Sequence, residues 1–172
     1  LGQALEQDLA LDVIIAENTR QSQELWHLRE SIPLAEKVLG KSVKHDIGVP
    51  VSEVADFVTQ TNAQIQAAYP GVEHVIFGHL GDGNLHYNVA KGRYTEAEVL
   101  SFEKAIYKIV FDQLQRVQGT LSAEHGIGQL KRDWLVLYQD PVELALMRQI
   151  KQALDPLNLM NPGKLLADSL PK

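Results

Sequence analysis

The feature that most constrains the fold is residues 78–86, which read GHLGDGNLH and lie between two runs of strand-forming side chains. An Asp-Gly pair in this setting favours a two-residue type I′ turn, so the segment is predicted to join the strands of an antiparallel hairpin. With Asp82 and Gly83 as the turn, His79 and His86 are paired directly across the two strands. Their Cβ atoms then lie about 4.5–5.5 Å apart on one sheet face.

Two imidazoles at this spacing can bind one divalent metal ion, each through a nitrogen about 2.0–2.1 Å from it. Asn88 lies two residues beyond His86, so its side chain points to the same face. The chain contains no cysteine, so any metal site must use His, Asp or Glu. The alternative is that both histidines are surface residues, and a change of strand register would separate them.

A second cluster occupies residues 122–128, which read SAEHGIG. Its glycines allow the backbone to approach a ligand closely, and a helix starting near Gly126 would present free N–H groups to an anion. Glu124 would complete a His-His-Glu donor set, and the adjacent His125 can act as a general base near neutral pH. The alternative is a helix cap with an ordinary solvent-exposed histidine.

Two cations form a third candidate site. Arg29 lies on the first long predicted helix, and Lys44 lies at the head of the strand that follows it. Together they can clamp a substrate carboxylate, to which an arginine binds through two parallel hydrogen bonds. The alternative is that both are solvated surface charges.

The spacing of apolar residues predicts the remaining elements. Strands are expected at 12–16 and 43–49 and in both halves of the hairpin at 72–90, with a short strand or bridge at 121–122. Helices are expected at 17–39, 52–69, 95–118 and 141–154, with a further helix starting near residue 126. Pro33 interrupts the first helix near Ser31, and Ser52 is expected to cap the second. This order favours α+β, with an antiparallel sheet and helices on one face.

Composition excludes several classes of protein. The 172 residues are 45% hydrophobic and 22% charged, which is typical of a globular domain. A net charge of -6 argues against a general nucleic-acid binder, and no apolar run approaches the roughly 20 residues of a membrane span. The chain begins without Met or a signal-peptide pattern, so we expect a piece of a longer cytoplasmic protein.

Three motifs occur in a fixed order: GHLGDGNLH, SAEHGIG, and LDPLNLMNPGK at residues 154–164. In this order they resemble the C-terminal domain of FAD-linked oxidases in the vanillyl-alcohol oxidase superfamily. The resemblance spans residues 12–166 and is nearest to the D-2-hydroxyglutarate and D-lactate dehydrogenases and the flavin subunit of glycolate oxidase. It implies that residues 1–172 form the cap and substrate domain, and that the N-terminal FAD-binding domain lies outside this chain. It also implies a ferredoxin-like sheet with a helical subdomain.

The resemblance implies roles for the first two motifs. His79, His86 and Glu124 match the ligands of a divalent metal, zinc or manganese. His125 matches the base that takes the substrate proton, and Asn88 matches a substrate contact beside the metal.

It also implies roles for residues further away. Arg29 and Lys44 match residues that hold the distal carboxylate of 2-hydroxyglutarate. Pro33 departs from that pattern, in which a hydroxyl residue is expected at this position. Asn161 and Gly163 match the tail that returns to the flavin.

The expected activity is oxidation of a small 2-hydroxy acid to a 2-oxo acid, with hydride transfer to FAD on the protein's own N-terminal domain. The sequence does not identify the electron acceptor, and the fragment alone is expected to lack turnover. The alternatives are a metal-dependent hydrolase and a non-catalytic docking domain, and the NPGK tail disfavours both. Self-association into a homodimer through the FAD-facing surface is a further expectation.

Overall fold

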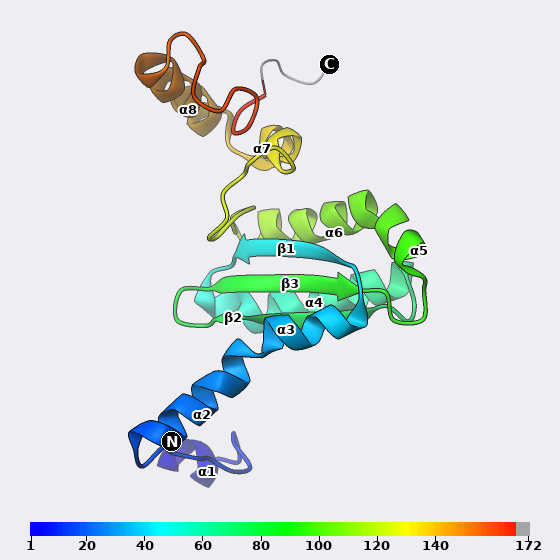
Figure 1. Cartoon of the computed structure of the whole chain (residues 1–172), viewed down its shortest axis with the longest axis vertical. Coiled ribbons are helices and arrows are strands. Elements are labelled where there is room, and N and C mark those ends of the chain that lie inside the picture. Colours follow the sequence, from blue (N-terminus) through cyan, green and yellow to red (C-terminus); the bar gives the residue numbers. More distant parts are fainter. Residues whose placement is uncertain (168–172) are drawn as a thin grey trace. The chain divides into compact units, whose positions relative to one another are not determined.

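The computed structural model describes residues 1–167, so residues 168–172 of the predicted domain lie outside the described part. The chain divides into two compact units, residues 1–38 and the remainder. The first unit contains the helices α1 (Gly2–Glu6), α2 (Thr19–Glu30) and α3 (Ile32–Glu36), and the 3-10 turn η1 (Lys37–Leu39) follows them (Figure 1).

The break between α2 and α3 confirms the predicted interruption at Ser31. Pro33 lies in the first turn of α3, where its missing N–H costs no helical hydrogen bond. The strand predicted at 12–16 is wrong, because these residues form neither helix nor strand, and Ile14 and Ile15 are exposed. An apolar run becomes a strand only where another strand can pair with its backbone, and residues 1–38 contain none.

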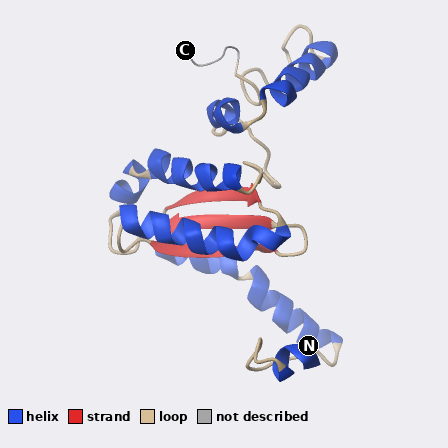
Figure 2. Ribbon diagram, turned by 180° about the vertical axis from the view of Figure 1, so that it is seen from behind, coloured by secondary structure: helices blue, strands red, loops and turns tan. Residues whose placement is uncertain are grey.

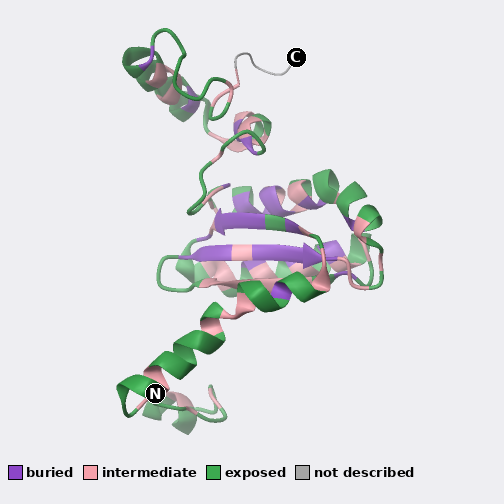
Figure 3. Ribbon diagram, viewed as in Figure 1, coloured by how far each residue is buried: buried purple, intermediate pink, exposed green. Residues whose placement is uncertain are grey.

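The second unit is built on a three-stranded antiparallel sheet of β1 (Ser42–Gly48), β2 (Glu73–His79) and β3 (Asn84–Ala90). The strand order is β1-β3-β2, so β3 is central. The helices α4 (Val54–Ala68) and α6 (Glu103–Arg116) pack on one face of the sheet (Figure 2). Alternate residues of β1 and β3 form the core with them, and Figure 3 shows both strands as largely buried. The predicted α+β class is confirmed.

A fourth strand of the ferredoxin-like order is reduced to a single bridge. After α6 the chain returns beside β1, where Thr120 and Gly48 exchange two backbone hydrogen bonds of 2.8 and 3.1 Å. This confirms the prediction of a short strand or bridge at this point, one residue earlier than expected. The chain then leaves the sheet, so β1 has a partner on its outer side at one residue only.

Helix boundaries follow local chemistry. The predicted helix from residue 95 is two helices, α5 (Glu96–Ser101) and α6, which meet at Phe102. Thr95 and Glu98 form the expected capping box. The cap expected at Ser52 is wrong: a 3-10 turn, η2 (Val51–Glu53), precedes α4, and the Ser52 hydroxyl bonds the Glu53 carboxylate.

The helical subdomain contains α7 (Arg132–Tyr138) and α8 (Pro141–Leu154). The Asp140 carboxylate caps α8, and the ring of Trp134 packs 5.4 Å from the ring of Phe111 on α6. The helix expected to start near Gly126 is wrong, because the chain is irregular from Leu121 until α7. Gly126 has a φ of 77°, in the left-handed region that a right-handed helix excludes. Among residues 1–167, no helix has both the length and the apolar character needed to cross a bilayer.

The hairpin forms as predicted but in another register. The loop is four residues long, residues 80–83, so His79 pairs with Asn84 and His86 pairs with Phe77. The two-residue turn and the directly opposed histidines are therefore wrong. Because the register differs by an even number of residues, His79 and His86 still share one face as diagonal neighbours.

The loop conformation explains the difference. The N–H groups of Asp82 and Gly83 both donate to the His79 carbonyl, which closes a longer loop than the type I′ turn. Gly83 has a φ of 73°, and its carbonyl accepts the Val49 N–H at 2.9 Å, which pins the hairpin tip to the end of β1. A Cβ at Gly83 would lie 1.8 Å from the Val49 oxygen, so only glycine fits there.

We therefore expect Gly83→Ala to lower the free energy of unfolding by at least about 1–2 kcal/mol, the cost of a left-handed residue alone. The measurement is urea-induced unfolding. Gly81→Ala is the matched control, because a Cβ at that loop position meets open space, and it should stay within about 0.5 kcal/mol of the parent. Equal losses for the two variants would contradict this account of the loop.

His45 is a buried histidine in the core. Its Nδ1–H donates to the Tyr87 carbonyl at 2.7 Å, and its ring packs 4.6 Å from that of Tyr107. Its Nε2 has no hydrogen-bond partner in the described part of the chain. Burial lowers the pKa of His45 from 6.5 to about 3. The hydrogen bond to Tyr87 raises this pKa, and the positive charge of Lys131 lowers it further. His45 is therefore neutral in the folded protein.

The unfolded chain binds a proton at His45 below pH 6.5 and the folded chain does not until about pH 3. Stability should therefore fall as the pH is lowered through this window, by up to about 1.4 kcal/mol per pH unit from this group. His45→Phe should show a shallower pH dependence of the free energy of unfolding, measured by urea titration. The exposed His27→Asn should keep the parent slope, and identical slopes for the parent and His45→Phe would contradict the assignment.

Candidate metal centre

The sheet face opposite the core carries a row of polar side chains. Asp46 of β1 is paired with His86 of β3, and Lys44 is paired with Asn88. Asn88 lies on the same face as His86, as its spacing predicts. Asp46 and Asn88 are buried, and the Lys44 side chain is exposed. The alternation of β1 and β3 therefore places these polar side chains together on the face opposite the core.

The Glu124 carboxylate lies between the two histidines of the hairpin. Glu124 Oε1 is 3.5 Å from His79 Nδ1, and Glu124 Oε2 is 3.8 Å from His86 Nε2. Both distances exceed an ordinary N–H···O hydrogen bond of about 2.7–3.2 Å. Two ligand atoms at about 2.1 Å from a tetrahedral ion are about 3.4 Å apart. Each imidazole nitrogen is thus at a distance from the Glu124 carboxylate that two ligands of one divalent metal can have.

Asn84 supports Glu124 from the sheet. Its side-chain N–H donates to Glu124 Oε1 at 2.6 Å, and the same nitrogen is 3.4 Å from His79 Nδ1. Asn84 is 4% exposed, so its amide is held in place by the surrounding strands. Sequence reasoning missed this residue, although it stands two positions before His86 and so shares its face.

Asp46 contacts the loop that carries Glu124 and His125. Its Oδ2 accepts the backbone N–H groups of Glu124 at 3.0 Å and His125 at 2.7 Å, and lies 3.4 Å from the Ser122 hydroxyl. The predicted helix start is absent at this point, so the free N–H groups of the loop bind a side chain of the sheet instead. Sequence reasoning did not assign Asp46, although its alternation with Lys44 places it on the polar face.

Asp46 remains ionised despite its burial. Burial alone would raise the pKa of its carboxyl, but the N–H groups of His125 and Glu124 and the charges of His125 and Lys131 outweigh it, and the net pKa lies below the ordinary value. A carboxylate that accepts several N–H donors is stabilised in its charged form. The polar face therefore carries a fixed negative charge beneath the loop.

A second donor set overlaps the first. Ligand atoms of Asp46, His86 and Glu124 lie within 4.8 Å of one another. The Asp46 oxygens, however, already accept the peptide N–H groups of Glu124 and His125, whereas His79 Nδ1 lies beside Glu124 Oε1 and the Asn84 side-chain nitrogen. Among the described residues, Asp46, His86 and Glu124 have ligand atoms this close together, and His79 adjoins this set beside Glu124 Oε1.

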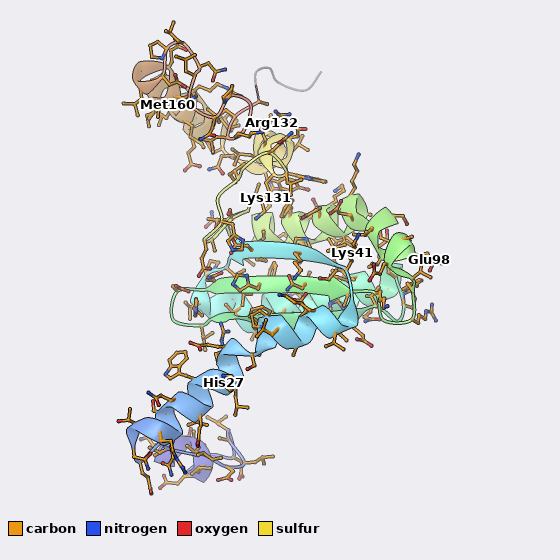
Figure 4. All side chains as sticks on the ribbon, viewed as in Figure 1. His27, Lys41, Glu98, Lys131, Arg132 and Met160 are labelled. Carbon is orange, nitrogen blue, oxygen red and sulfur yellow. The ribbon has the colours of Figure 1, made fainter. Side chains whose placement is uncertain are left out.

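Lys131 secures the loop from below. Its side-chain nitrogen donates to the Asp46 carbonyl at 2.9 Å and to the Leu121 carbonyl at 2.6 Å, and the residue is 9% exposed. Figure 4 labels Lys131 just before α7. Burial lowers its pKa, and the charge of Asp46 opposes that effect. Lys131 thus ties the first residue of the irregular segment to β1.

His125 is the most exposed member of the cluster. Its side chain is 69% exposed, with Nδ1 3.4 Å from Asp46 Oδ2, and its ring lies 5.8 Å from that of His86. The expectation that it stands at a helix N-terminus is wrong. The structure does bring His79, His86, Glu124 and His125 together, as the two motifs predict.

The predicted carboxylate clamp spans both units. Arg29 is near the end of α2 in the first unit, and Lys44 is in β1 of the second. Because the two residues belong to different units, the pairing of the two cations stays a prediction.

The tail residues line a groove of about 860 Å³ in the second unit. Asn161 and Gly163 both have positive φ, and the Gly163 carbonyl accepts a hydrogen bond from Arg132 at 2.9 Å. Gly126 and Gly128, from the loop of His125, line the same groove. The structure therefore brings the second and third motifs to one cavity.

Comparison with known proteins identifies the family of the chain. Residues 1–165 match the family described as FAD linked oxidases, C-terminal domain. The D-2-hydroxyglutarate dehydrogenase of Xanthomonas citri pv. viticola is 41% identical over 162 residues, which are 94% of this chain and 34% of that protein. That of Stutzerimonas stutzeri is 39% identical over 95% of this chain and 35% of its own length.

The mitochondrial D-2-hydroxyglutarate dehydrogenase of Bos taurus is 36% identical over 96% of this chain and 29% of its own length. The chain thus spans about a third of the length of these curated relatives. Because the family match covers nearly every residue, the chain belongs to the C-terminal domain family of FAD-linked oxidases.

Proposed function

We propose that this chain is the substrate- and metal-binding domain of an FAD-dependent D-2-hydroxy acid dehydrogenase, and that its substrate is D-2-hydroxyglutarate. The observation that carries the proposal is the position of Glu124 between His79 and His86 on the polar sheet face. The curated relatives named above support the choice of substrate. In this proposal residues 1–172 form the cap domain, and a separate FAD-binding domain belongs to the same protein.

We assign His79 Nδ1, His86 Nε2 and the Glu124 carboxylate as the ligands of a divalent metal, zinc or manganese. Imidazole nitrogens and a carboxylate suit either ion. When bound, the metal supplies Lewis-acid polarisation of a hydroxyl oxygen, and FAD supplies the hydride acceptor. Asn84 keeps the Glu124 carboxylate in position through its hydrogen bond to Oε1.

His125 takes the proton of the substrate hydroxyl in this proposal. It is next to Glu124 in sequence, and its exposed imidazole is accessible to a molecule bound over the polar face. An imidazole within reach of the substrate hydroxyl can act as a general base.

Asn88 and Lys44 orient the rest of the substrate. They are two residues along β3 and β1 from His86 and Asp46, a displacement of about 6.7 Å along the strands. This displacement is comparable to the length of a five-carbon dicarboxylate, so one end can lie at the donor set while Lys44 binds the other. Arg29 would join Lys44, and Asn161 and Gly163 would face the flavin.

The remaining predictions concern the whole protein. A cytoplasmic location stays a prediction, because some curated relatives are named as mitochondrial. The homodimer and the electron acceptor also stay predictions. The hydrolase alternative would use the same donor set but would act without flavin, so a flavin readout separates the two.

The first test expresses the domain within its complete reading frame and follows flavin absorbance anaerobically. D-2-hydroxyglutarate should bleach the flavin, and prior treatment with EDTA should abolish the bleaching, because the hydroxyl is then not polarised. D-lactate and glycolate serve as comparison substrates. A flavoprotein that no 2-hydroxy acid bleaches would contradict the substrate assignment. A flavoprotein that is bleached equally after prolonged EDTA treatment would contradict the metal assignment.

In the same protein, His125→Asn should lower turnover by about 10²–10⁴-fold, the usual contribution of a general base. Flavin content should stay at the parent level. His27→Asn is the matched control, because His27 is an exposed histidine on α2 outside the cluster, and it should keep parent turnover. Parent-level turnover of His125→Asn would overturn the base assignment.

A further inference from the structure

We infer that Asp46 is a positioning residue: its carboxylate binds the peptide N–H groups of Glu124 and His125 and thereby sets where both side chains stand over the sheet. The inference rests on the proposed function in so far as Glu124 is a metal ligand and His125 the base. It assigns Asp46 to the support of the site and excludes it from the ligands.

The contacts single out Asp46 as the link between loop and sheet. Its Oδ2 accepts the His125 N–H at 2.7 Å and the Glu124 N–H at 3.0 Å, and its Oδ1 lies 3.3 Å from the latter nitrogen. Hydrogen bonds to an ionised acceptor are roughly twice as strong as those between neutral groups. Asp46 is 4% exposed on a central part of β1, so the acceptor itself is fixed.

Glu124 and His125 lie in an irregular and partly exposed part of the chain. Residues 121–131 form no helix or strand, and the side chains of Glu124 and His125 are 46% and 69% exposed. Gly126 and Gly128 have positive φ and add no side-chain packing. Leu121 and Ile127 pack on the core on either side of Glu124 and His125, so it is the hydrogen bonds to Asp46 that attach the peptide groups of these two residues to the sheet.

The backbone of Asp46 adds a second attachment. Its carbonyl accepts the Lys131 ammonium, which also binds the Leu121 carbonyl. Leu121 begins the irregular segment and Lys131 ends it, so the Lys131 side chain links the two ends of the segment. Asp46 thus binds the middle of the loop through its side chain and Lys131 at the end of the loop through its carbonyl.

The same contacts separate Asp46 from the metal ligands. A carboxylate oxygen that binds a metal must direct a lone pair at the ion, and the Asp46 oxygens already accept two peptide N–H groups and lie near the Ser122 hydroxyl. If Asp46 moved to bind a metal, the Glu124 and His125 N–H groups would lose their acceptor. Glu124 accepts the Asn84 side-chain N–H at Oε1, and its Oε2 lies 3.8 Å from His86 Nε2.

The first experiment measures backbone amide hydrogen exchange in the metal-free 172-residue chain by NMR. Asp46→Asn is nearly isosteric but uncharged, and the Glu124 and His125 amides should exchange at least about tenfold faster in it, while core amides of β3 keep parent rates. Asp112→Asn is the matched control: this carboxylate binds Tyr138 and Lys108 on α6, and its loss should not change exchange at the loop. Unchanged exchange at Glu124 and His125 in Asp46→Asn would overturn the inference.

The second experiment titrates the same proteins with Co²⁺ and records the visible d–d spectrum. A positioning role predicts that Asp46→Asn binds Co²⁺ about 10–100-fold more weakly, with the parent spectrum. A changed spectrum would show that Asp46 is a ligand and would overturn the inference. If the parent chain binds no Co²⁺, the proposed metal site fails, and hydrogen exchange alone decides the role of Asp46.

Discussion

The central strand β3 is hydrogen-bonded along both edges, and both faces of the sheet depend on this double pairing. Its odd-numbered residues Leu85, Tyr87 and Val89 are in the core, so its even-numbered residues must point away from it. A slip of one residue against either neighbour would exchange the two sets and expose the core. Burial of the apolar set therefore fixes the position of the polar row, including His86, without any contribution from a ligand.

Local patterns were enough to predict most of the second unit. The capping box at Thr95, the start of α8 after Asp140 and the hairpin each follow from a few neighbouring residues. The hairpin register was not predictable, because the Asp-Gly pair suits a two-residue turn as well as the tip of a four-residue loop. The shared face of the two histidines was predictable all the same, because both loop lengths preserve it.

The contacts of Asp46 and Lys131 that support the site could not be predicted from the sequence, for a different reason. The Asp46 carboxylate meets the Glu124 N–H 78 residues further along the chain, and Lys131 reaches β1 from 85 residues away. Neither contact follows from a spacing or a motif, since an acidic residue alternating with apolar ones indicates only a half-exposed strand. Such pairings depend on how the chain returns to β1 after α6, and that is a tertiary property.

The antiparallel pairing beside β1 stops at the single bridge between Gly48 and Thr120, and this has a consequence for the site. If the antiparallel pairing continued, residues 122 and 124 would lie beside 46 and 44, and their peptide groups would be committed to the ladder. The N–H groups of the loop could then not turn to the Asp46 carboxylate, and Glu124 would be drawn along the sheet edge, away from His79. The same peptide groups can either extend a fourth strand or bind Asp46 and hold Glu124 and His125 above the sheet. In this chain the fourth strand ends at Thr120.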